Sequence, residues 1–487
     1  MPRQKGVLLH LSSLPSDFGI GGLGREAYAF VDYLKAQDHD YWQILPLNYP
    51  GYGDSPYNPL SSFAGNPYLI DPLLLYEHGF ITKQDLDAAR LPNNGKVNFA
   101  HVYKAKNKLF LKAFHKHDHL HWLKELSEYM EQEAYWLKPF AVFHQLKKHS
   151  KNQPWQKWKG EFKHYSEQQF DLLLQANPEN NLYPVFLQKL FEKQLTELKR
   201  YAVGKGIQII GDLPLYVSLD SSDVWSRPDL FELNESGNPL RVAGVPPDAF
   251  SETGQLWGNP LYRWDRMKEE NYEWWKKRLD RSFLFADKLR IDHFIGLVNY
   301  WAVDAHEKDA INGSWIKGPG SDFFDSILPF FDRERFIAED LGILTDEVNN
   351  LRDHYGFPGM IILQFCFQDD HNDILSFPEN KIIYTGTHDN QTTTGWFLSN
   401  QKCKKPDNHF LEAYLHKTGL LPESEKLTTG NVSNLLTQLA QASPCRISIV
   451  PMQDILALDD KARMNIPGTA LGNWRWRMTD SAFSQNG

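Results

Sequence analysis

Eight short runs of apolar and β-branched residues recur along the chain, and segments with helical periodicity separate most of them. Short apolar runs bounded by turn residues are typical of strands that are buried in a sheet. The predicted strands lie at residues 7–11, 41–47, 207–215, 287–292, 335–341, 359–365, 381–387 and 446–452.

Helices are predicted between these runs, at residues 25–37, 271–286, 345–356 and 429–442. Thr345 has the character of an N-cap, and Asp346 and Glu347 follow it in the first turn. Alternating strands and helices imply a parallel sheet, and eight such units imply a (β/α)8 barrel, also called a TIM barrel. We therefore predict an α/β fold of this type, with one catalytic domain over residues 1–487.

The spacing between the predicted strands is uneven after the second and the third strand. Some 160 residues separate the second strand from the third, and residues 75–205 in this gap are mostly helical in pattern. We predict a helical subdomain that is inserted into the barrel. Residues 237–264, after the third strand, are rich in Gly and Pro and have little periodicity. Loops of this length are usually functional, so we predict a long active-site loop on the barrel rim.

Composition narrows the classes of partner. Apolar residues make up 41% and charged residues 23% of the chain, the net charge is −9, and no Lys/Arg-rich run occurs. We therefore expect neither nucleic acid nor a membrane as a partner. No apolar run approaches the ~20 residues that span a bilayer. Three cysteines without a CxxC motif, and an N-terminus without a signal-peptide pattern, predict a cytoplasmic protein with no thiol-bound metal.

Carboxylates follow four of the predicted strands. Asp212 ends the third strand, Asp292 the fourth and Glu339 the fifth, while His388 and Asp389 follow the seventh. Active sites of (β/α)8 barrels lie at the carboxyl ends of the strands. One acid at such a position can simply cap the next helix, but four acids that converge on one rim indicate a functional site.

The fourth strand carries unusual charge for a buried element. Strand alternation places Lys288, Arg290 and Asp292 on one face. A guanidinium beside Asp292 favours the ionised carboxylate. An ionised acid beside a protonated acid is what glycoside chemistry requires. Taken alone, the Arg290–Asp292 pair fits a structural ion pair equally well.

Two further motifs favour unrelated chemistry only weakly. Residues 19–24, GIGGLG, fit GxGxxG, but seven residues separate them from the preceding strand, so we expect a turn rather than a dinucleotide site. Residues 115–121, HKHDHLH, place only histidines four apart on one helical face, and no further ligands complete a zinc set. We expect a solvated helix end there. No HExxH, P-loop or GxSxG motif occurs.

Seven motifs in order along the chain carry a family resemblance. They are GYGDSPYNPLSSFAGNPYLIDP (51–72), GDLPLYV with DSSDVW (211–225), VAGVPPDAFSETGQLWGNPLY (242–262), RIDHF, IAEDLG, YTGTHDN and ARMNIPGTALGNWRWR (462–477). These closely resemble 4-α-glucanotransferases, also called amylomaltases or disproportionating enzymes, which form glycoside hydrolase family 77 of the α-amylase clan. The motifs cover essentially the whole chain.

The resemblance implies roles for individual residues. Asp292 corresponds to the nucleophile, Glu339 to the general acid/base and Asp389 to the stabiliser of the transition state. Tyr52 resembles part of a second glucan site, although an ordinary surface tyrosine is equally expected. No metal or organic cofactor is implied. The predicted substrate-binding residues are Ser55, Tyr57, Asp212, Asp248, Gln255, Trp257, Arg290, His388 and Asn465.

The expected function is retaining transfer of an α-1,4-glucan segment from a maltooligosaccharide or linear glucan to glucose or another glucan. The sequence leaves two alternatives open, an α-1,4-glucan hydrolase on the same barrel and a non-enzymatic glucan-binding protein. It also leaves the oligomeric state open. Two positions depart from the family habit, Ile295 in DHFIG and Gln391 after HDN, and neither replaces a predicted catalytic group.

Overall fold

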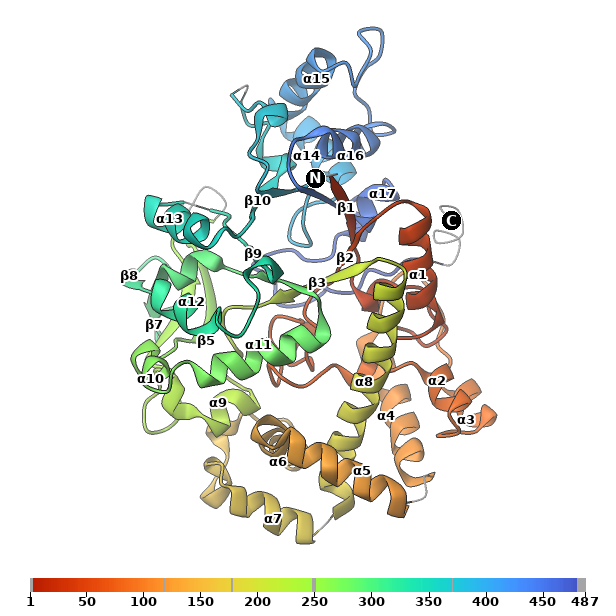
Figure 1. Cartoon of the computed structure of the whole chain (residues 1–487), viewed down its shortest axis with the longest axis vertical. Coiled ribbons are helices and arrows are strands. Elements are labelled where there is room, and N and C mark those ends of the chain that lie inside the picture. The colour runs from red at the N-terminus through yellow and green to blue at the C-terminus, as the bar shows by residue number, and fades with distance from the viewer. Residues whose placement is uncertain are drawn as a thin grey trace.

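Eight parallel strands form the centre of the structure, a computed structural model (Figure 1). It describes residues 3–116, 119–176, 178–247, 251–342, 344–369 and 371–479. The central strands are β1 (Gln4–Leu8), β2 (Tyr41–Gln43), β3 (Gln208–Leu213), β6 (Lys288–Ile291), β9 (Phe336–Ala338), β10 (Gly359–Ile362), β11 (Lys381–Tyr384) and β12 (Ile447–Pro451).

The strands pair in the order β10-β11-β12-β1-β2-β3-β6-β9. The two end strands also meet, since the Ala338 amide donates to the Pro358 carbonyl at 2.9 Å. The sheet is therefore a nearly closed barrel, which confirms the predicted fold. Seven of these strands are shorter than the runs that predicted them, whereas β1 has the predicted length but begins three residues earlier. β2 ends at Gln43, and Pro46 in its predicted remainder has no amide to donate to a neighbouring strand.

All four predicted helices form on the outside of the barrel. They are α1 (Arg25–Ala36), α11 (Glu273–Phe285), α13 (Asp346–Tyr355) and α16 (Val432–Ala442). Thr345 caps α13 as predicted, because its hydroxyl accepts from the Val348 amide at 3.4 Å. Further helices are α9 (Ser222–Ser226), α10 (Trp264–Glu269), α12 (Ser321–Ile327), α14 (Thr393–Cys403), α15 (Asp407–Lys417) and α17 (Met452–Ile455).

The GIGGLG motif forms the turn that leads into α1. A β carbon on Gly21 would lie 2.1 Å from the Leu11 carbonyl oxygen, so this turn packs tightly against its own chain. Gly24 is the N-cap of α1. The expected turn accounts for these glycines.

In the described residues, seven α-helices lie between β2 and β3, in the lower part of the molecule (Figure 1). They are α2 (Pro72–Glu77), α3 (Lys83–Ala88), α4 (Phe99–Lys116), α5 (His119–Gln132), α6 (Ala134–His149), α7 (Glu167–Ala176) and α8 (Pro178–Gly204). The boundaries of a subdomain at residues 75–205 stay a prediction. His117 and Asp118 of the histidine-rich motif lie outside the described residues.

Helix α8 fixes the chain that approaches the barrel rim. The buried Gln188 side chain accepts from the Gly65 amide at 2.7 Å and donates to the Gly65 carbonyl at 2.8 Å. Six residues further along the helix, Gln194 accepts from the Asp71 amide at 2.8 Å. These bonds satisfy the backbone of a buried, irregular segment, as such a segment requires. The inserted helices thus help to position the chain that also carries Ser55 and Tyr57.

The structure differs from the expected loop at residues 237–264. This segment contains β4 (Arg241–Val245) and β5 (Gln255–Pro260). They join β7 (Asn299–Asp304) and β8 (Gly313–Lys317) in an antiparallel sheet of order β5-β4-β7-β8, here called the rim sheet. The partner strand β7 is distant in sequence, so the local pattern of Gly and Pro did not indicate strands.

Candidate active site

The register of three neighbouring strands brings the predicted acids together. Arg290 pairs with Asp212 across β3 and β6, and Ile291 pairs with Ala338 across β6 and β9. Asp292 and Glu339 follow these strands and continue the ladder, since their amides donate to Leu213 at 3.0 Å and to Ile291 at 3.1 Å. Both carboxylates therefore leave the barrel at the same edge.

Arg290 forms the centre of this cluster. Its Nη1 donates to both carboxylate oxygens of Asp212, at 2.8 and 2.7 Å, and to Oδ1 of Asp292 at 2.9 Å. The predicted contact with Asp292 is confirmed. The Asp212 side chain has no exposed surface, whereas 30% of the Asp292 side chain is exposed. Asp212 therefore lies below the rim and orients Arg290, while Asp292 is open to a ligand.

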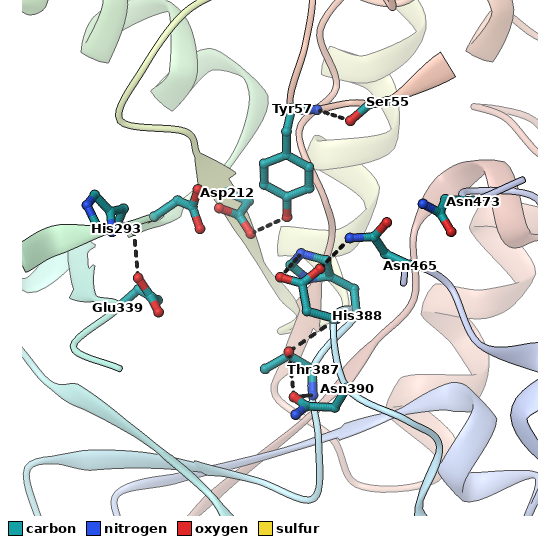
Figure 2. A network of polar contacts seen from close by, with 12 residues as sticks. Ser55, Tyr57, Asp212, His293, Glu339, Thr387, His388, Asn390, Asn465 and Asn473 are labelled. Atoms are coloured by element: carbon teal, nitrogen blue, oxygen red, sulfur yellow. Dashed lines mark hydrogen bonds and ion pairs between the residues drawn. The ribbon is translucent and has the colours of Figure 1, made fainter. Parts of the chain in front are cut away.

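Glu339 keeps its proton in this site. Burial, with a smaller contribution from the nearby Asp292, raises the pKa of Glu339 to about 8 against the opposing effect of Arg290. Its Oε2 accepts from the His293 amide at 2.7 Å (Figure 2). The site thus places an acid that is still protonated at neutral pH beside the Asp292 side chain, which is hydrogen-bonded to a guanidinium.

Asp389 is held from the opposite side of the site. Its Oδ1 accepts from Asn465 Nδ2 at 2.6 Å, and its Oδ2 lies 3.3 Å from His388 Nε2. Burial acts to raise the pKa of Asp389, but His388, Asn465 and Arg290 together bring it below its usual value. Nearly half of its side chain, 46%, is exposed. Asp389 is therefore an ionised carboxylate that a ligand can reach.

Tyr57 connects these two sides of the site. Its hydroxyl donates to Asp212 Oδ2 at 3.0 Å (Figure 2), and its ring stacks on His388 with centroids 5.1 Å apart. The Ser55 hydroxyl accepts from the Tyr57 amide at 3.2 Å. Ser55 thus shapes the turn that presents Tyr57.

The rim sheet supplies the remaining wall. Trp257 packs edge-on against His293, with centroids 4.8 Å apart, and its Nε1 donates to Gln255 at 3.2 Å. Since the His293 amide holds Glu339, this wall adjoins the acid. Asp248 lies outside the described residues. Tyr52 is 76% exposed.

Two residues of this site were missed in the sequence. Trp474 packs against Tyr57 at 5.5 Å and His388 at 5.9 Å, and Arg463 donates to the Asp389 carbonyl at 2.7 Å. Both belong to the motif at 462–477 from which only Asn465 was selected. The motif itself was the signal, because its arginines and tryptophans are as compatible with a site as Asn465.

The described residues contain no group of three or more His, Cys, Asp or Glu that could hold a metal ion. Within the same part of the chain, every helix is too short or too polar to cross a membrane. The arrangement offers a ligand one buried acid, Glu339, and two partly exposed side chains, Asp292 and Asp389.

A parallel barrel with such carboxylates at neighbouring strand ends defines a class, the (β/α)8-barrel enzymes with a paired-carboxylate site suited to glycosidic bonds. Within this class, the chain belongs to the 4-alpha-glucanotransferase family, whose sequence model matches residues 9–482.

Relatives and solved structures agree with this assignment. The 4-alpha-glucanotransferase of Thermus thermophilus is 41% identical over 99% of this chain and 96% of its own. That of Aquifex aeolicus is 40% identical over 98% and 96%. The structure of the amylomaltase from Streptococcus agalactiae in complex with acarbose has a TM-score of 0.91 and 39% identity, covering 99% of this chain and 97% of that one. The predicted family and fold are confirmed.

Proposed function

We propose that this chain transfers α-1,4-glucan segments by two successive displacements at Asp292, with Glu339 as the acid and base. The observation that carries this proposal is the contrast between the two carboxyl groups. Glu339 retains its proton to about pH 8, while Asp292 is exposed beside Arg290. Retaining glycoside chemistry needs one carboxyl group that is protonated and a second one that acts as the nucleophile.

In the first displacement, an Asp292 oxygen attacks the anomeric carbon of the donor. The bond from that carbon to the next glucose breaks, and Glu339 gives its proton to the departing 4-oxygen. In the second displacement, the 4-hydroxyl of an acceptor attacks the same carbon and Asp292 departs. Glu339 takes the proton of the acceptor hydroxyl and returns to its starting state. Two inversions preserve the α configuration.

Asp389 is proposed to bind hydroxyls of the reacting sugar as its ring flattens. Its bonds to Asn465 and His388 fix both oxygens, and this pre-organisation favours interactions that strengthen in the transition state. Tyr57, stacked on His388, is proposed to form the apolar floor under that sugar.

Transfer rather than hydrolysis requires that an acceptor hydroxyl compete with water at ~55 M, so water must be excluded while the acceptor is positioned. Trp257, Gln255 and Asp248 are proposed to provide this shielding. Maltooligosaccharides and α-1,4-glucans are the proposed substrates. We also propose that the protein is located in the cytoplasm, as its cysteines predict.

Incubation of the wild-type chain with maltotriose tests this function. We expect glucose together with a ladder of maltooligosaccharides longer than maltotriose, resolved by anion-exchange chromatography. Products that are all shorter than maltotriose would identify the hydrolase alternative. Binding without any product would identify the glucan-binding alternative.

The substitution Trp257→Ala tests the shielding. We expect the ratio of hydrolysis to transfer on maltotriose to rise several-fold, because removal of the indole opens the wall next to Glu339. Hydrolysis is measured as the increase in total reducing ends, and transfer as the amount of products longer than maltotriose. Leu256→Ala is a matched control, since Leu256 and Trp257 are adjacent and both 37% exposed. An equal ratio in both variants would exclude Trp257 from this role.

A further inference from the structure

Two tryptophans lie side by side on the face of the rim sheet that points away from Trp257. Trp301 of β7 and Trp315 of β8 are direct cross-strand partners, and their rings lie 5.3 Å apart at 66°. Directly paired residues project from the same face of a sheet. Trp315 is 53% exposed, an unusual position for the largest apolar side chain.

This pair of indoles is held in place. Trp301 Nε1 donates to the Ala310 carbonyl at 2.9 Å, and Ala310 packs with Val242 and Val303 in a small buried cluster. A β carbon on Gly313 would lie 2.3 Å from Trp301 Nε1, so the glycine leaves room for that ring. Trp301 is therefore a fixed base against which the Trp315 ring packs.

Polar groups adjoin the indoles on the same face. Asn299 and Lys317 form the next cross-strand pair of this face, two residues away from Trp301 and Trp315. Lys317 is exposed, and Asn299 Nδ2 donates to Glu347 of α13 at 3.1 Å. An apolar surface flanked by amide, ammonium and carboxylate groups suits a sugar, because a pyranose ring has C–H faces to stack and hydroxyls around its edge to bind.

The rim sheet is also part of the catalytic region. Its strand β5 carries Trp257 on the face towards Glu339, and β7 begins seven residues after Asp292. Figure 1 shows β7 and β8 beside α12 and α13, at the edge of the barrel.

We propose that Trp315 and Trp301 form a second binding site for α-1,4-glucan chains, which retains long substrates near the catalytic site. This inference rests on the proposed function for the identity of the ligand. Two indoles offer at most about 500 Å² of surface, less than the roughly 800 Å² that each partner buries in a stable protein–protein complex. The patch therefore fits a glucan chain better than a protein.

The test compares Trp315→Ala with Phe330→Ala, a control that removes another exposed aromatic ring, 66% exposed, outside this patch. We expect Trp315→Ala to raise KM for amylose about five-fold, the range of one aromatic stacking contact. KM and kcat for maltotriose should not change. Trp315→Phe should restore most of the affinity for amylose, which a purely structural role of the indole would not explain.

Binding is measured independently of activity by electrophoresis in native gels that contain amylose. All chains carry Asp292→Asn for this purpose, so the polymer is not consumed. We expect weaker retardation for Trp315→Ala than for Phe330→Ala, at equal Tm. Equal retardation and equal KM for amylose would overturn the second site. Failure of the wild-type chain to form longer products from maltotriose would instead overturn the proposed function, whatever the gels show.

Discussion

Asp292→Asn is expected to lower kcat for transfer between maltooligosaccharides by a factor on the order of 10⁴ or more. The amide oxygen is a poor nucleophile, so the covalent intermediate does not form, and removal of one member of a catalytic unit costs nearly the whole effect of that unit. The rate follows from glucose released from maltotriose, measured with a coupled assay.

The fold should survive this change. Arg290 keeps both hydrogen bonds to Asp212, at 2.8 and 2.7 Å, so its buried charge stays paired. Asp287→Asn is the control, because Asp287 stands at the other end of the same strand and accepts from the Ile209 amide at 2.8 Å. We expect this control to retain kcat. A kcat for Asp292→Asn within about tenfold of the control would remove Asp292 from the role of nucleophile.

A shorter side chain gives a more specific test of the same role. Asp292→Gly leaves space for azide, which attacks the anomeric carbon of α-maltosyl fluoride as fluoride departs. Because azide would approach from the face that Asp292 occupies, the expected product is the β-configured maltosyl azide, identified by NMR. An α-configured product would show that the nucleophile lies elsewhere.

The barrel was predictable because its signals are local. Each strand is a short apolar run and each helix has its own periodicity, as the Thr345 cap of α13 illustrates. The rim sheet was not predictable in this way. β4 forms because Gly244 pairs with Trp301, more than 50 residues away, and with Leu256 in a segment whose Gly and Pro content suggests a loop. Such pairing depends on tertiary structure rather than on the local pattern.

The positions of the carboxylates at the strand ends were also predictable, because each strand could be located and the register then fixes the place of its last residues. The burial and the hydrogen-bond partners of each carboxylate were not predictable. The exposed fractions of Asp212 and Asp292 distinguish a residue that orients Arg290 from one that a ligand can reach. In the sequence, both simply lie at the end of an apolar run. Trp474 reaches Tyr57 across more than 400 residues of chain. Only the closed barrel brings these segments together.

Glu339→Gln is expected to lower kcat on maltotriose by about 10²–10⁴-fold, the usual effect of losing a general acid. The wild-type chain should lose kcat/KM as the pH rises through about 8, where free Glu339 gives up its proton. The variant cannot ionise at this position, so its residual kcat/KM should lack that alkaline limb. Glu334→Gln, on the turn before strand β9, is the control. It should retain the wild-type kcat and the fall of kcat/KM at alkaline pH.

The role of Glu339 as an acid can be separated from a structural role with α-maltosyl fluoride as donor. Fluoride leaves without protonation, so Glu339→Gln should still form the intermediate and release about one equivalent of fluoride per chain in a rapid burst. The second displacement lacks its base and should then limit turnover. A fluoride burst as slow as turnover on maltotriose would show that the substitution disturbs the site as a whole.

The same pKa makes a prediction for stability. Glu339 holds its proton in the folded chain up to about pH 8, whereas the unfolded chain releases it near the ordinary value of 4.5. Between these values the unfolded state binds fewer protons, so the free energy of unfolding of the wild-type chain falls as the pH rises. The glutamine of the variant has no proton to lose. The Tm of Glu339→Gln should therefore exceed that of the wild-type chain by a margin that grows from pH 5 to pH 8, measured by scanning calorimetry. A constant margin over this range would mean that Glu339 ionises normally in the folded chain, and a different acid would then have to protonate the leaving group.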